Sequence, residues 1–293
     1  MPRVKSVIVF VVCCALLAAG RPSSGALLQS KRSSATDLQI TGMIAGITPG
    51  AVRYISYKHL LKLPTVTIPI QPDDNFTELP RQKVVITGIY LDVLAQSLGA
   101  LPGADLIVAI CSDRYHAHFS REYTQQHRPI LALKINGLPV NTWAKKTHNK
   151  SPGTYFITHA SFTPSFKVLS YDEMPQIPAV IAGLDFNSSP LVFGAIAPSA
   201  NYASTPEIDA GYRIAKQDCL RCHNMNSTGG TKADRTWQTL GTRAATSPAT
   251  FERLVRDPKS IDPNASMPPN PSFDDAIAKA LQAYFQTFSA EAH

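Results

Sequence analysis

The sequence predicts a multidomain protein, with a strand-rich α+β domain at its N-terminus and an all-α domain at its C-terminus. Its 293 residues are enough for about two domains. Short β-rich segments separated by turn residues fill the first half of the chain, together with two short helical patterns. In the second half, apolar residues recur with helical spacing at 207–216, 248–255 and 273–288.

The composition is that of an ordinary globular protein, with 44% hydrophobic and 17% charged residues. The net charge is +7, and three of the cations, Arg3, Lys5 and Arg21, belong to the N-terminal leader. The rest of the chain is too mildly basic to indicate a nucleic-acid partner. A modest positive surface could bind an acidic partner protein, but an ordinary solvated surface explains it equally well.

Residues 1–26 have the pattern of a secretory signal peptide. Arg3 and Lys5 precede an apolar run from Val7 to Ala19, which is shorter than a membrane span needs, and Ser24-Gly25-Ala26 supplies small residues for cleavage. We therefore expect a periplasmic protein that has no membrane span once the leader is cleaved. The alternative is a leader retained as a membrane anchor.

Three further segments follow the leader. The strand-rich domain is predicted over 37–169, and the helical domain over 206–293. Residues 170–205 between them are rich in Pro, Gly and Ser and have no sustained period, so we expect an ordered strap across the domain boundary.

Turn and cap residues mark the elements of the first domain. Ser56 is expected to cap a helix over 57–63, Gly99 to end a helix over 91–98, and Asn136-Gly137 to form a hairpin turn. The expected strands lie at 38–40, 66–68, 84–86, 105–110, 130–135, 154–158 and 166–169.

The stretch Cys219-Leu220-Arg221-Cys222-His223 has the C-x-x-C-H form that attaches c-type haem. Two thiols on one helical turn reach the two vinyl groups along one edge of a porphyrin, and His223 follows as the proximal iron ligand. The alternatives are a disulfide or half of a zinc site, but no second Cys or His pair follows at ligand spacing. Cys13 and Cys14 lie in the leader and Cys111 is left over, so the sequence predicts no disulfide framework.

Met267 in Ser266-Met267-Pro268-Pro269 is the candidate for the second axial position of the iron. A thioether on a proline-stiffened loop, separated from His223 by a predicted helix, has enough chain to reach the opposite face of the haem. Met225 is too close to His223 to do so. A histidine from the first domain is a rival ligand, and a Met267 that only fills the core is the rival interpretation of this loop.

These residues resemble those of class I cytochromes c. The shared features are Gly211-Tyr212 on the first helix, the haem motif, and Met267-Pro268 before the last helix. The resemblance implies His223/Met267 ligation and single-electron transfer. Where that family has a Gly-Pro that supports the proximal histidine, this chain has Gly229-Gly230, so the partner that orients His223 is not identified from sequence. Trp237 suits either the haem edge or the core.

The first domain resembles the molybdopterin-binding domain of the sulfite oxidase family. The matching pieces occur in the family's order: a helix entry, a Pro-Gly-Ala turn, a second turn and a hairpin. They are Gly88–Leu94, Leu101–Asp105, Cys111–Tyr115 and Leu131–Val140. The resemblance implies the family's α+β fold and a possible molybdopterin site.

The departures from that family argue against the cofactor. No Cys occurs between Ile68 and Lys83, where the family has its molybdenum ligand, and a metal that needs a thiolate cannot be assumed without one. Trp143, Lys145 and Lys146 match the family's basic cofactor loop poorly. We interpret the domain as a shortened relative without molybdopterin. Cys111 is either a displaced ligand or, as favoured by the apolar strand before it, a small buried residue.

Two groups of polar residues in the first domain are candidates for a binding site. His116 and His118 share one face if they lie on a strand, where they would bind a metal or line a pocket. Arg121, His127 and Arg128 are candidates for an anion patch. A solvated surface is the alternative for both groups.

Three functions follow from these observations. The first is an electron-transfer protein with a docking module at its N-terminus, exchanging electrons with a donor and an acceptor that the sequence does not identify. The second is a molybdenum enzyme that oxidises a small anion such as sulfite and passes the electrons to its own haem. The third is a redox or ligand sensor, with His116, His118 and Arg121 lining its pocket.

Overall fold

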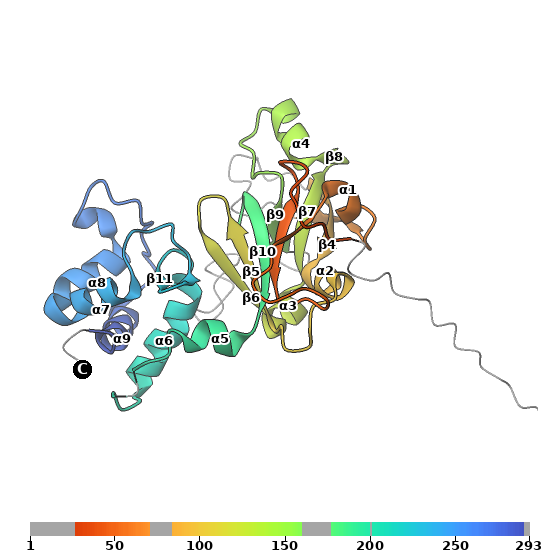
Figure 1. The fold of residues 1–293 in the computed structure, drawn as a ribbon. Coiled ribbons are helices and arrows are strands. Elements are labelled where there is room, and N and C mark those ends of the chain that lie inside the picture. The colour runs from red at the N-terminus through yellow and green to blue at the C-terminus, as the bar shows by residue number, and fades with distance from the viewer. Residues whose placement is uncertain (1–26, 71–83, 160–176, 200, 290–293) are drawn as a thin grey trace, which may run out of the picture.

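The computed structural model describes residues 27–70, 84–159, 177–199 and 201–289. The strand-rich and helical parts form two adjoining lobes (Figure 1). The predicted leader and the strand expected at 166–169 lie outside the described residues, as do residues 71–83. None of the described helices is long and apolar enough to cross a membrane.

The first sheet has five strands in the order β2-β1-β10-β5-β6. Strands β1 and β10 run parallel, and every other neighbouring pair is antiparallel. Its members are β1 (Leu38–Gly42), β2 (Arg53–Ile55), β5 (Leu106–Cys111), β6 (His116–Ser120) and β10 (Ile181–Asn187).

Strand β10 was not expected from the sequence, which predicted an ordered strap without a sustained period over 170–205. Residues 181–187 instead form the central strand of the sheet, and α5 (Ser189–Gly194) follows. The pairing of β10 with β5 shifts register between Ile181 and Gly183, which breaks the alternation of buried residues. A bulge of this kind removes the period-two pattern that reveals a strand in sequence.

The second sheet follows the order β3-β4-β7-β8, with β9 also paired to β7. Asn136 and Gly137 have φ angles of 49° and 80° and form the tight turn between β7 and β8, as predicted. The strands are β3 (Val66–Ile70), β4 (Val84–Tyr90), β7 (Pro129–Ile135), β8 (Leu138–Pro139) and β9 (Phe156–His159).

Four helices accompany these sheets: α1 (Tyr57–Leu60), α2 (Leu91–Leu98), α3 (Arg121–His127) and α4 (Val140–Thr147). The predicted caps are confirmed, since the Ser56 hydroxyl accepts from the N–H of His59 at 3.2 Å and Gly99 ends α2 with φ 75°. Helix α1 is shorter than expected, and α3 and α4 escaped prediction because each is only about two turns long and largely polar.

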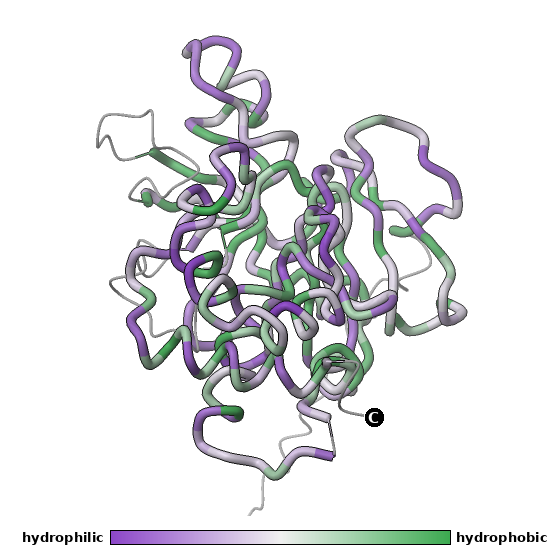
Figure 2. Tube along the Cα trace, turned by 90° about the vertical axis from the view of Figure 1, so that its left-hand side faces the viewer, coloured by the Kyte–Doolittle hydropathy of each residue, from purple (hydrophilic) through white to green (hydrophobic). Residues whose placement is uncertain are grey.

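One hydrophobic cluster contains residues from both sheets together with α2, and α4 packs into a second cluster with residues of β4, β7 and β9. Because β7 belongs to both clusters, six of its seven residues are buried. Figure 2 shows hydrophobic segments running through the middle of the molecule and hydrophilic ones in many outer loops.

The C-terminal domain is a set of helices in which the first, α6, crosses the last, α9. Gly211 permits this crossing, since a Cβ there would lie 2.1 Å from the carbonyl oxygen of Ala280. The rings of Tyr212 and Tyr284 are 5.8 Å apart, so Gly211-Tyr212 forms a small-plus-aromatic contact with the last helix. The elements are α6 (Pro206–Asp218), β11 (Asn224–Met225), β12 (Thr228–Gly229), α7 (Trp237–Thr246), α8 (Pro248–Arg256), η4 (Pro258–Ser260) and α9 (Asp275–Gln286).

The two domains meet at β5. Ile107 and Ala109 belong to the cluster between the sheets, whereas Leu106 and Val108 belong to the cluster of the C-terminal helices. Successive side chains of a strand point to opposite faces, so the two sides of β5 face two different cores. This explains why its sequence is a continuous apolar run.

Candidate functional site

The haem-attachment motif forms a helical turn directly after α6. The N–H groups of Cys222 and His223 both donate to the carbonyl oxygen of Cys219, at 3.2 and 2.9 Å. Both thiols are free and half-buried. The turn therefore joins the two cysteines and the histidine in the local conformation that their sequence spacing predicted.

The imidazole of His223 is oriented by the main chain of Arg235, whose carbonyl oxygen lies 2.7 Å from Nδ1. A carbonyl only accepts, so Nδ1 carries the proton and the lone pair remains on Nε2, the form that a metal ligand needs. Burial lowers the pKa of His223, which favours the neutral ring, while the Arg235 carbonyl opposes that shift.

The sequence does not identify this orienting partner, because the class I cytochromes c have it at a Gly-Pro where this chain has Gly229-Gly230. In the structure these glycines perform a packing role instead. Gly229 has φ +97°, and a Cβ on it would lie 2.5 Å from the carbonyl oxygen of His223. The main chain at 229 thus passes against the attachment turn, where a larger residue would collide with it.

Met267 lies half-buried in the loop between η4 and α9. Asn270 anchors that loop to the end of α8, donating from Nδ2 to the carbonyl oxygen of Val255 at 2.8 Å and from its main-chain N–H to that of Arg256 at 2.7 Å. The rival Met225 has its sulfur 2.9 Å from Nε2 of Gln238. Its sulfur is thus already in a polar contact, and the ligand role of Met267 stays a prediction.

Trp237 is a core residue. It is fully buried, its Nε1–H donates to the hydroxyl of Tyr284 at 3.1 Å, and its ring lies 5.0 Å from that of Phe285. The Tyr284 hydroxyl is also hydrogen-bonded to the carbonyl oxygen of Ile196. The indole therefore stabilises the junction of α7 and α9, and the Tyr284 hydroxyl links it to Ile196 in the chain after α5.

The residues present fit a covalently bound haem. Two free thiols lie on one helical turn, and an imidazole with its Nδ1–H fixed lies beside them. Cys219 packs against the apolar cluster of the C-terminal helices, which includes Leu220 and Ile214. Such a shell excludes water and tunes a bound cofactor.

The first domain contacts this motif through the turn between β5 and β6. The main-chain N–H of His116 donates to the carbonyl oxygen of Arg221, and that of Thr231 donates to the carbonyl oxygen of Arg114, at 2.9 and 3.1 Å. Lys232 adds an ion pair with Asp113 at 2.7 Å, in which both side chains are nearly half exposed.

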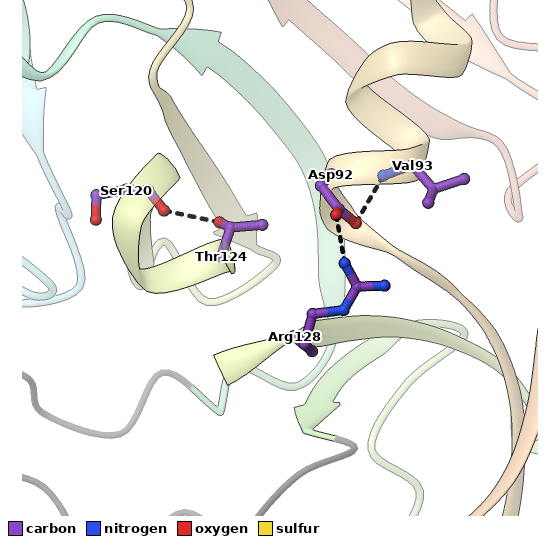
Figure 3. Close-up of polar contacts among 5 residues, drawn as sticks. All are labelled: Asp92, Val93, Ser120, Thr124 and Arg128. Atoms are coloured by element: carbon purple, nitrogen blue, oxygen red, sulfur yellow. Dashed lines mark hydrogen bonds and ion pairs between the residues drawn. The ribbon is translucent and has the colours of Figure 1, made fainter. Parts of the chain in front are cut away.

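The structure does not gather Arg121, His127 and Arg128 into an anion patch. Arg121 donates to the carbonyl oxygen of Pro102, and Arg128 forms an ion pair with Asp92 at 2.7 Å (Figure 3). His127 is buried against the ring of Tyr123, with ring centroids 4.6 Å apart. Each of the three side chains thus faces different partners.

His116 and His118 lie on β6 with ring centroids 6.5 Å apart, so they share a face as predicted. His118 is buried and packs against Phe193 of α5 at 5.8 Å. Burial lowers the pKa of His118 to about 3. No group of three or more potential metal ligands occurs among the described residues.

Cys111 is a core residue at the end of β5 and is only 4% exposed. Burial raises the pKa of its thiol to about 12. The burial of Cys111 supports its interpretation as a small core residue.

Trp143 on α4 is also buried, whereas Lys145 and Lys146 on the same helix are exposed.

Residues 206–285 match the family described as cytochrome C oxidase, cbb3-type, subunit III. Residues 206–285 form a cytochrome c domain. Its cofactor is covalently bound haem c, and such a domain exchanges electrons with partner proteins. The mixed α/β region before this domain makes the chain a multidomain protein.

A solved structure similar to this chain is that of the sulfane dehydrogenase SoxCD from Paracoccus pantotrophus. The identity is 16% and the TM-score 0.37, over 55% of this chain and 40% of that chain. This chain therefore spans less than half of that protein, and no activity is transferred from it. Among curated proteins, none matches this chain.

Proposed function

We propose that this chain is an exported, periplasmic electron-transfer protein in which Cys219 and Cys222 attach haem c, and His223 and Met267 are the axial ligands. The observation that carries the proposal is the His223 imidazole, fixed through Nδ1 by the Arg235 carbonyl, beside two free thiols on one helical turn. When bound, haem c would accept and donate one electron reversibly, and methionine ligation would favour its reduced form.

The first domain acts in this proposal as a docking module without a cofactor of its own. Its β5–β6 turn pairs with the attachment motif through main-chain hydrogen bonds. Its sequence has no cysteine between Ile68 and Lys83, and Cys111 is buried in the core. We also propose that the two domains span 37–169 and 206–293, with strand β10 as an additional part of the strand-rich domain.

A molybdenum enzyme of the sulfite oxidase type is the second candidate. It is favoured by the order of β4, α2, the 101–105 turn, β5 and the β7–β8 hairpin, which follows the motifs that resemble that family. The missing thiolate opposes it. The sensor hypothesis is weakened because Arg121 and His118 contact different parts of the chain.

Elemental analysis and absorption spectra of the purified full-length chain test the proposal. We expect about one iron per chain, no molybdenum, and a haem spectrum that survives denaturation because the cofactor is covalently attached. A C219A/C222A variant is the matched control and should lose the covalent haem. Molybdenum in stoichiometric amount would instead establish the second candidate, and a chain purified without haem would refute the first.

A further inference from the structure

Arg221 is a cation inside the haem-attachment motif, yet the residue is only 9% exposed. It occupies the position between the two cysteines that follows Leu220. Arginine stays charged in proteins, and an arginine is rarely buried unless its charge is compensated. Its burial within the attachment motif therefore needs a physical cause.

The burial comes from the first domain. The Arg221 guanidinium hydrogen-bonds the hydroxyl of Tyr115, which lies on the β5–β6 turn. The main chain of Arg221 accepts from His116, and Thr231 donates to Arg114. Gly230 lies against the same crossing, since a Cβ there would be 1.9 Å from the Arg221 carbonyl oxygen and 3.0 Å from that of Arg114.

The positive charge is only partly compensated. Asp218, one turn earlier, attracts the guanidinium, but its own carboxyl is buried and the pKa is raised to about 6. Two guanidinium nitrogens, Nε and Nη2, are buried without a hydrogen-bond partner among the described residues. A buried charge acts on its neighbours much more strongly than an exposed one, because solvent and salt do not screen it.

We propose that the positive charge of Arg221, which Tyr115 of the first domain holds in place, favours the reduced state of the haem. One-electron oxidation adds a positive charge to the site, and a fixed cation on the attachment turn makes that addition less favourable. The first domain thereby sets the electron affinity of the cytochrome domain, in addition to docking it. This inference rests on the proposed electron-transfer function and goes beyond it.

Potentiometric titration of the full-length, haem-loaded protein tests this inference. R221Q removes the charge, and we expect the equilibrium constant for reduction by a fixed donor to fall on the order of tenfold. R221K keeps the charge and should remain within about threefold of the parent. R253Q, which removes an exposed arginine from α8 of the same domain, is the matched control and should leave the constant unchanged.

A second measurement separates this role from a purely structural one. Raising the ionic strength should not abolish the difference between R221Q and the parent, because the charge is buried. Hydrogen exchange at residues 113–116 should become faster in R221Q, which reports the lost contact with Tyr115. Faster exchange with an unchanged reduction equilibrium would overturn the inference and leave Arg221 as an interface residue only.

A double variant guards against misfolding of R221Q. D218N/R221Q removes the two opposite buried charges together, which costs less than removing one of them and leaving the other uncompensated. It should show weaker reduction than D218N alone, and equal constants would refute the inference. Absence of haem from the parent protein is a different result, because it would refute the proposed function itself.

Discussion

The main-chain N–H of His116 donates a hydrogen bond to the carbonyl oxygen of Arg221, with 2.9 Å between nitrogen and oxygen. This bond joins the edge strand of the first sheet to the haem-attachment turn, 105 positions further along the chain. An edge strand otherwise presents unpaired main-chain groups. The haem motif thus satisfies part of that edge, and the two domains share main-chain hydrogen bonds.

Gly230 is the residue at which this crossing leaves no room. G230A would place a Cβ 1.9 Å from the Arg221 carbonyl oxygen, so the two main chains must separate. We expect a loss of about 2 kcal/mol or more in the free energy of unfolding, measured by denaturant titration.

G194A is the control for that substitution. Gly194 ends α5 and a Cβ there meets nothing within 4 Å, so the stability should be unchanged or slightly higher. Equal stabilities of G230A and G194A would contradict the described interface.

Met267 and Met225 are distinguished by absorption spectroscopy of the oxidised protein. M267A should lose the long-wavelength band that the resemblance to class I cytochromes c leads us to expect for methionine ligation, and its reduction potential should fall. M225L should keep both, because the Met225 sulfur contacts Gln238. Retention of the band in M267A would reject the ligand assignment.

Two buried histidines predict a pH-dependent stability. Burial lowers the pKa values of His118 and His159 to about 3, with His116 and Arg221 adding to the first shift and His127 to the second. Above about pH 6.5 both histidines are neutral in the folded and in the unfolded protein. Below that pH they are protonated in the unfolded chain but stay neutral in the folded one, so the free energy of unfolding decreases as the pH falls.

Each of the two histidines should contribute about 2 kcal/mol of that loss between pH 6.5 and pH 5. Denaturant titrations across this range check the slope, which H118Q and H159Q should each reduce. H148Q alters an exposed side chain and should keep the parental slope. Asp218, with its pKa raised to about 6, acts with the opposite sign, so the comparison between variants carries the prediction.

Cys111 should be unreactive toward thiol reagents in the folded protein. Its thiol is buried and its pKa is raised to about 12, so almost no thiolate exists at neutral pH. In denaturant the haem-loaded mature chain should expose about one thiol, since Cys219 and Cys222 are consumed by haem attachment, and C111A should expose none. Fast labelling of the native protein would show that the end of β5 opens.

Sequence reasoning succeeded where the signal is local. Ser56, Gly99 and Asn136-Gly137 act within a few residues of their own position, and each has the predicted role. The helical turn at Cys219–His223 is likewise encoded by its own spacing. These features need no knowledge of the tertiary structure.

It failed where a distant contact decides the structure. Strand β10 is hidden by a bulge and becomes recognisable only through its partners β1 and β5. The Arg235 carbonyl that orients His223 is a main-chain group, which any residue type supplies. The environment of Arg221 depends on Tyr115, which belongs to another domain. None of these relationships leaves a pattern in neighbouring residues.

The strand β5, buried on both faces, has a consequence for how the molecule unfolds. Leu106 and Val108 support the cytochrome helices, and Ile107 and Ala109 support the sheets, so neither core can melt without disturbing the same strand. The two domains are therefore expected to form one cooperative unit, with a single calorimetric transition. Cleavage of the chain near residue 205 would expose the apolar face of β5 that the C-terminal helices cover, and it would not release two independently folded domains.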